Sequence, residues 1–153
     1  MNVIGIDPGS SSGGIAFLKD NKEYEAYKMP DTPKDIYLLI KELKNKSGED
    51  RLVAVLEKVN SMPGQGIVSA WSFSGNYHGL EMALYALEIE WYNPRPLEWQ
   101  KALKIPKKSN DESKTQFKNR LKKEAQRLFP LITIRNYSAD ALLLAKFGYM
   151  NYV

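Results

Sequence analysis

Residues 2–17, NVIGIDPGSSSGGIAF, form the stretch that decides the fold. The β-branched apolar residues of NVIGID predict a short buried strand over 2–7, which ends on the carboxylate of Asp7. A turn of proline, glycine and serine residues follows at once, and their small side chains cannot cover the charge. Two explanations compete for a carboxylate in this position: a loop that binds a nucleotide phosphate, or one ligand of a metal-dependent nuclease.

The residues after this stretch predict two more strands and then a helix. GGIAFL (13–18) and KEYEAYKM (22–29) are joined by the turn DNK, so the first three strands are expected to form an antiparallel meander. Apolar residues at 36, 39, 40 and 43 recur with a helical period. Asp31 or Thr32 is expected to cap this helix, and Ser47-Gly48 to end it.

The second half of the chain alternates strands with helices. The strands are expected at VAVL (53–56) and EIEWYN (88–93), and the helices from about Ser69 to Leu87 after the SMPGQG loop, over 96–103, over 111–129 and over 138–148. Ser138 is expected to cap the last helix, and Gly148 to end it. This order predicts an α/β fold, with a five-stranded mixed sheet flanked by helices, in a single domain over 1–153.

Composition narrows the kind of protein and of partner. The absence of cysteine excludes disulfides and thiolate-bound zinc, and no signal peptide or membrane-spanning run is present, so we expect a cytoplasmic protein. The net charge of +4 is unevenly spread: residues 95–135 hold 12 Lys or Arg against 4 acidic residues, and the remainder is acidic. Basic charge confined to one region indicates a surface that faces a polyanion, although a solvated helix face also fits.

Three carboxylates stand at the ends of predicted elements. Asp7 and Glu57 each close an apolar strand, so both project from one sheet edge if those strands are neighbours. Asp140 lies near the start of the last helix, where it could instead be a partner of the helix dipole. Crowded carboxylates need a cation, and Mg²⁺ or Mn²⁺ prefers oxygen ligands. A pair of such ions can hydrolyse a phosphodiester with water.

Other kinds of site fit the sequence poorly. His78 is the single histidine, and we interpret it as a structural or surface residue. The sequence lacks the G-x-S-x-G pattern of serine hydrolases and the P-loop pattern of nucleotide-binding proteins. An ATP-binding half-domain of the actin and sugar-kinase kind also opens with a strand, an Asp and a glycine turn. That fold needs two domains to enclose the nucleotide, and it leaves the basic region unexplained.

Four motifs, in order along nearly the whole chain, resemble those of the RuvC family of Holliday junction resolvases. They are GIDPGSSSGGIAF, LEKVNSMPGQGIVSAWSFSGNYHGL, YNPRPLEWQKAL and SADALLLA. The resemblance implies a ribonuclease H-like fold and a homodimer that binds four-way DNA junctions. It also implies Mg²⁺-dependent nicking of two strands of like polarity, with Mn²⁺ able to substitute.

The resemblance also implies roles for individual residues. By position, Asp7, Glu57 and Asp140 match the metal-binding catalytic carboxylates of the family. Lys101 and Lys114 match basic residues that contact DNA phosphate, and Lys114 is expected to steady the charge of the transition state as a catalytic residue. Further DNA-binding lysines are expected nearby, at Lys107, Lys108 and Lys118. The helix that ends near Leu87 corresponds to the dimer interface of the family.

Two positions depart from the family's pattern. Tyr137 stands where the family has a fourth metal ligand, so the site uses three carboxylates and water, or recruits Asp111 or Glu112. Asn60 replaces an aromatic residue that helps to open the junction in bacterial members. Trp71 or Phe73 could substitute by stacking on bases, or could belong to the core.

The PGQG loop and the short chain look most like the phage, poxvirus and mitochondrial branch. A phage-encoded member would act in the host cytoplasm and could also cut forks and flaps. The missing fourth ligand leaves open a junction-binding protein with weak or lost catalysis.

Overall fold

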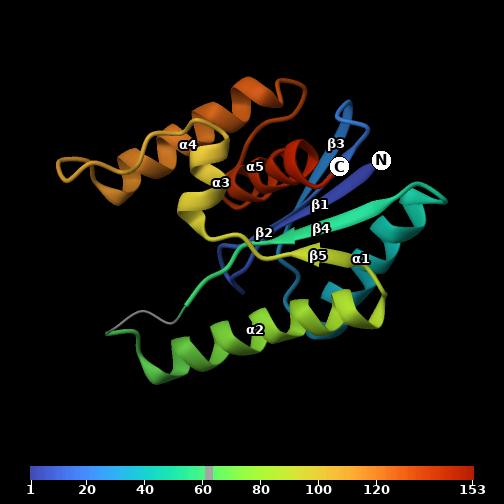
Figure 1. Ribbon diagram of the computed structural model, residues 1–153. Helices are drawn as coiled ribbons and strands as arrows, with labels where there is room; N and C mark the ends of the chain where they lie inside the picture. The colour runs from blue at the N-terminus through green and yellow to red at the C-terminus, as the bar shows by residue number, and fades with distance from the viewer. Residues whose placement is uncertain (61–63) are drawn as a thin grey trace.

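The five strands form one mixed sheet (Figure 1). In the computed structural model, which describes residues 1–60 and 64–153, the strands are β1 (Asn2–Asp7), β2 (Gly14–Lys19), β3 (Glu23–Lys28), β4 (Leu52–Leu56) and β5 (Glu90–Tyr92). Their order is β3-β2-β1-β4-β5, with β1, β2 and β3 antiparallel and with β4 parallel to both β1 and β5. The predicted fold class and meander are therefore confirmed. Part of the predicted SMPGQG loop, residues 61–63, lies outside the described residues.

Helices cover both faces of this sheet (Figure 1). They are α1 (Pro33–Ser47) and α2 (Ile67–Ala86) on one face, and α3 (Pro96–Ala102), α4 (Lys114–Leu128) and α5 (Asn136–Asn151) on the other. Successive side chains of a strand point to opposite faces. Accordingly, Val3 is buried with α5, whereas Ile4 and Ile6 are buried with α1 and α2. None of the helices in the described residues is long and apolar enough to cross a membrane.

The cap of α1 agrees with the sequence prediction, whereas the starts of α4 and α5 are displaced in the structure. The Thr32 hydroxyl accepts a hydrogen bond from the backbone N–H of Asp35 (3.1 Å), so Thr32 caps α1 as one of the two expected residues. The helix predicted from residue 111 begins at Lys114 instead, because Ser113 and Gln116 form a reciprocal capping box. The last helix begins at Asn136, two residues earlier than predicted, with Arg135 rather than Ser138 as its N-cap.

Gly148 does not end α5, which continues to Asn151. A side chain at Gly148 would place its Cβ 2.5 Å from Val55 Cγ2, and one at Gly5 would place it 2.1 Å from the carbonyl oxygen of Ala141. Real Cβ atoms do not approach so closely, so both glycines let α5 lie directly on β1 and β4. The glycine that the sequence suggested as a terminator is a packing residue.

One end of α2 carries an exposed apolar surface. Leu80 and Leu84 are fully buried against the sheet, whereas Ile67, Val68 and Trp71 in the first turns are 83–88% exposed. Figure 1 shows these first turns extending past the sheet. Trp71, one of the two aromatic residues that could have belonged to the core, is therefore a surface residue.

Candidate functional site

Asp7 and Glu57 are neighbours because their strands are neighbours. The parallel pairing of β1 with β4 places Ile6 opposite Leu56, so the next residue of each strand emerges at the same sheet edge. The backbone N–H of Glu57 donates to the carbonyl oxygen of Ile6 (3.0 Å), which extends the ladder by one residue. The strand pairing that the two carboxylates needed in order to share an edge is therefore present.

Asp140 reaches the same group of charges from α5. Its side chain is buried, and its negative charge acts on both Asp7 and Glu57. Because α5 begins at Asn136, Asp140 lies in the second turn rather than in the first. The alternative of a first-turn partner for the helix dipole therefore does not apply to it.

Burial and mutual repulsion oppose the ionisation of this cluster. Burial raises the pKa of Asp7 well above its usual range, and the charges of Asp140 and Glu57 raise that pKa further. Burial also raises the pKa of Glu57 to about 7, against a hydrogen bond from Trp99 that lowers it. Carboxylates that are costly to ionise in this way are stabilised by a nearby cation.

Asp140 has one oxygen paired and one without a partner. The ammonium group of Lys118 pairs with Asp140 Oδ2, although the Lys118 side chain is 62% exposed and that of Asp140 only 6%. Asp140 Oδ1 is buried and accepts no hydrogen bond from the described residues. A buried oxygen with no donor is costly, and such oxygens are what hard cations bind.

The residues present therefore fit Mg²⁺ or Mn²⁺ by the chemistry of the donor set, with Asp7, Glu57 and Asp140 as the groups that would hold it. This fit concerns the chemistry of the donors and not their present arrangement. In the side-chain positions of the described residues, no three acidic or imidazole groups are arranged so that they could hold an ion. The positive charge beside Asp140 is the Lys118 ammonium group. An ion at Asp140 would use the partnerless Oδ1 or replace Lys118 at Oδ2.

The glycine-serine turn after Asp7 is held by α2. The backbone N–H of Gly9 donates to Oδ1 of the buried Asn76 (2.9 Å), and the hydroxyl groups of Ser10 and Ser72 lie 3.3 Å apart. Gly9 has a φ of 143°, which a residue with a side chain rarely adopts. Gly9 is therefore required for a conformational reason, and Ser12 of the same turn lines a trough together with Asp7.

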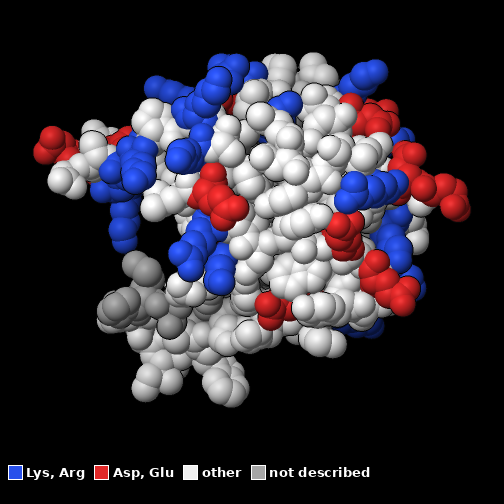
Figure 2. All heavy atoms as spheres, in the orientation of Figure 1, with Lys and Arg blue, Asp and Glu red and all other residues white. Residues whose placement is uncertain are grey.

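A trough of about 460 Å³ lies beside Asp7. Asp7 and Ser12 form one part of its lining, and α4 contributes Lys114, Lys118 and Lys122 at intervals of four residues. Figure 2 shows Lys and Arg gathered over α4, whereas acidic and basic groups are mixed on the opposite side of that view. Lys122, which the sequence analysis did not single out, belongs to the same row.

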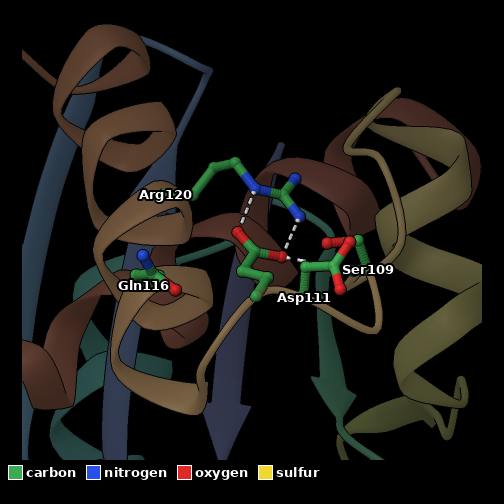
Figure 3. A pocket seen from close by; sticks show the side chains of 5 residues that line it. Ser109, Asp111, Gln116 and Arg120 are labelled. Carbon is green, nitrogen blue, oxygen red and sulfur yellow. Dashed lines mark hydrogen bonds and ion pairs between the residues drawn. The ribbon is translucent and has the colours of Figure 1, made fainter.

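The other predicted DNA-binding lysines lie elsewhere. Lys101 and Lys107 line a separate hollow of about 220 Å³, and Lys108 is exposed in the loop before α4. Arg120 anchors this loop (Figure 3): its guanidinium group donates to both carboxylate oxygens of Glu112 at 3.0 Å and to the Pro106 carbonyl oxygen at 2.8 Å. The structure thus brings Lys114 and Lys118 to Asp7, but not Lys101, Lys107 or Lys108.

Neither Asp111 nor Glu112 lies where it could replace the fourth ligand. Glu112 is held by Arg120, and Asp111 lines the pocket shown in Figure 3, which does not contain Asp7. The Ser138 hydroxyl accepts a hydrogen bond from the backbone N–H of Arg135 (2.8 Å) at the start of α5. Asn136 lines the trough with Asp7, and its side-chain oxygen is a neutral donor for a cation.

Trp99 is a residue of the site that the sequence analysis missed. Its indole Nε1 donates a hydrogen bond to Glu57 Oε1 (2.8 Å), and both side chains are buried. The motif YNPRPLEWQKAL had been identified, but a contact across 42 residues leaves no local spacing that could have revealed it. His78, in contrast, is the surface residue that the sequence suggested, and it contacts Glu81.

Neither a protein-family profile nor a curated protein matches this sequence. Among solved structures, the chain is similar to Thermus thermophilus RuvC in complex with a Holliday junction substrate, with a TM-score of 0.65 and 17% sequence identity over 98% of this chain and 95% of that one. A second Thermus thermophilus RuvC structure gives a TM-score of 0.62 and 16% identity over 98% of this chain and 96% of that one. These similarities show that the chain has the ribonuclease H-like fold of RuvC.

Proposed function

We propose that this protein is a metal-dependent endonuclease that resolves Holliday junctions. The observation that carries the proposal is the meeting of Asp7, Glu57 and Asp140, from three separate elements, beside a lysine-lined trough. The fold supports it, because a RuvC protein with the same fold was solved with a Holliday junction substrate. Because proteins with the same fold can have different functions, the proposal rests on the charged site rather than on the structural similarity.

In this proposal Asp7, Glu57 and Asp140 hold Mg²⁺, for which Mn²⁺ can substitute. The bound ions would supply the activation of water and the stabilisation of the leaving oxygen. Lys114 and Lys118, which line the trough with Asp7, contact the phosphate and stabilise the charge that develops on it. The open glycine-serine turn admits the DNA backbone to the carboxylates.

Lys101, Lys107 and Lys108 act farther from the carboxylates. Because they line a different hollow or lie in the loop that Arg120 anchors, they contact phosphates outside the cleaved position. Such contacts position the DNA without reading its sequence. Their binding energy falls with salt, so junction affinity is expected to decrease steeply as the salt concentration rises.

A homodimer fits the exposed end of α2. Ile67, Val68 and Trp71 form an apolar surface that a second copy would remove from water, and two sites in one dimer match a substrate with two strands to cut. We place the protein with the phage, poxvirus and mitochondrial branch of resolvases, acting in the cytoplasm, or in that of the host if it is phage-encoded. Forks and flaps are further substrates in this proposal.

A nicking assay tests the proposal. A synthetic four-way junction, a fork and a linear duplex of the same sequence are incubated with the protein in Mg²⁺, in Mn²⁺ and in EDTA. We expect paired nicks in the junction with either metal, fewer in the fork, and none in the duplex or in EDTA. Asp7→Asn should abolish nicking, whereas Asp31→Asn, at an exposed position, should not. Full cleavage by the Asp7→Asn variant would refute the proposed site.

A junction-binding protein without catalysis is the second candidate. The observation that favours it is the absence of an acidic side chain at Tyr137, together with Glu112 being held by Arg120. Tight, salt-sensitive junction binding with no nicking in either Mg²⁺ or Mn²⁺ would select this alternative.

A further inference from the structure

Trp99 links a carboxylate of the site to the hydrophobic core. Its side chain is 1% exposed and packs in the cluster between the sheet and the helices α3, α4 and α5. An indole N–H can only donate, and a buried one requires an acceptor. The acceptor here is Oε1 of Glu57, at 2.8 Å.

The segment that carries Trp99 is fastened to the end of β4. Asn93 donates from Nδ2 to the carbonyl oxygen of Leu56 (2.7 Å), and the backbone N–H of Lys58 donates to the carbonyl oxygen of Pro94 (2.8 Å). These contacts involve the residues on either side of Glu57. The contacts of Asn93, Pro94 and Trp99 therefore fix both the backbone next to Glu57 and the side chain of Glu57.

We propose that Trp99 is a positioning residue that holds the Glu57 carboxylate in the orientation that binds the divalent cation. The inference rests on the function proposed above, in which Glu57 is a metal ligand. Trp99 donates to Oε1, so Oε2 is the oxygen that would be offered to the ion. The donor carries no charge, so it orients the carboxylate without adding the repulsion that a lysine or arginine would exert on the ion.

The size of the effect follows from the role. Hydrogen-bond partners of metal-ligating side chains typically change metal affinity by about 10- to 100-fold when they are removed. Trp99→Phe retains an aromatic ring in the core and removes the N–H group. We expect this variant to bind Mn²⁺ about 10-fold more weakly than the wild type. Its junction nicking should be restored at saturating Mn²⁺, which a general loss of folding would not permit.

The binding experiment uses the full chain and Mn²⁺ alone, with free Mn²⁺ measured by electron paramagnetic resonance. Ile105→Val is the matched control, because Ile105 packs in the same buried cluster as Trp99 and loses only a methylene. We expect Mn²⁺ affinity to fall in Trp99→Phe and to be unchanged in Ile105→Val. Equal affinity in Trp99→Phe and the wild type would overturn the role of Trp99.

A second measurement needs no variant at position 99. In protein with ¹⁵N-labelled tryptophan, the indole signal of Trp99 should shift on titration with Mg²⁺, and that of the exposed Trp71 should not. Phe variants of Trp71 and Trp91 assign the three signals. A Trp99 signal that does not move while the wild type binds Mg²⁺ and nicks junctions would overturn this inference alone. A wild type that neither binds metal nor nicks would overturn the proposed function as well.

Discussion

Glu57→Gln should make the metal-free protein more stable while abolishing the proposed nicking activity. Glutamine has nearly the shape of glutamate, and its amide oxygen can still accept the hydrogen bond from Trp99. The substitution therefore removes the charge of a buried carboxylate with little change in packing. Sites built for binding are often less stable than the same fold could be, and this variant tests that trade-off directly.

The size of the gain follows from the pKa of Glu57, which rises from 4.5 to about 7 on folding. Between these values the folded protein binds more protons than the unfolded chain, so the free energy of unfolding of the wild type falls as the pH rises. One pKa unit corresponds to about 1.4 kcal/mol, so the full loss above pH 7 is about 3 kcal/mol. Glu57→Gln does not titrate and escapes that loss. Its advantage should be near zero below pH 4.5 and about 3 kcal/mol at pH 8.

Thermal and urea unfolding in EDTA at pH 4.5 and pH 8 would measure this difference. For a chain of this size, about 3 kcal/mol corresponds to a rise of roughly 6–12 °C in Tm. The exposed Glu49 provides a control, because Glu49→Gln should change stability little at either pH. Saturating Mg²⁺ should narrow the gap at pH 8 by stabilising the wild type. A gain that is absent at pH 8, or equal at both pH values, would refute the reasoning.

Three further changes test other parts of the structure. Lys118→Met removes the cation paired with Asp140, so the free energy of unfolding in EDTA should fall by about 1 kcal/mol, and Mn²⁺ should restore it. A decrease in the free energy of unfolding that Mn²⁺ does not change would contradict this. Arg120→Gln should free the loop before α4, raising its trypsin cleavage and weakening junction binding several-fold. Arg127→Gln, which only breaks a pair within α4, should do neither, and equal behaviour of the two would count against the anchoring role. Gly5→Ala should destabilise the fold by more than about 3 kcal/mol in urea unfolding, since its Cβ meets backbone at 2.1 Å, whereas Gly75→Ala in open space should stabilise by up to about 1 kcal/mol. Similar values for the two alanines would be inconsistent with the close approach of α5.

Local patterns predicted the sheet well because they are set by neighbours in sequence. Apolar runs that end on Asp7 and Glu57 were enough to place both residues at strand ends, and the pairing of β1 with β4 then brought them together. The starts of α4 and α5 were missed by two or three residues, because several nearby polar residues could serve as caps. Gly148 was misread because its tight packing against Val55 depends on a strand far away in sequence.

The site was predictable as a set of charges but not as a set of contacts. Acidic residues at the ends of apolar runs can be recognised in the sequence. The hydrogen-bond donor to Glu57 is Trp99, which lies 42 residues away in a helix whose pattern indicates only a core residue. The pairing of Lys118 with Asp140 likewise joins two helices, and the sequence suggested only DNA contact for that lysine. Both contacts join residues far apart in sequence, so they can be identified only when the fold is known.

The positions of Asp7, Glu57 and Asp140 along the chain have a consequence for folding. Asp7 lies at the end of β1 and Asp140 on α5, and α5 must settle on Gly5 before the three carboxylates meet. A nascent or truncated chain without α5 therefore has no assembled cluster, even if its β-meander has already formed. In the proposed function, the capacity to cut DNA would therefore depend on the packing of α5 against β1.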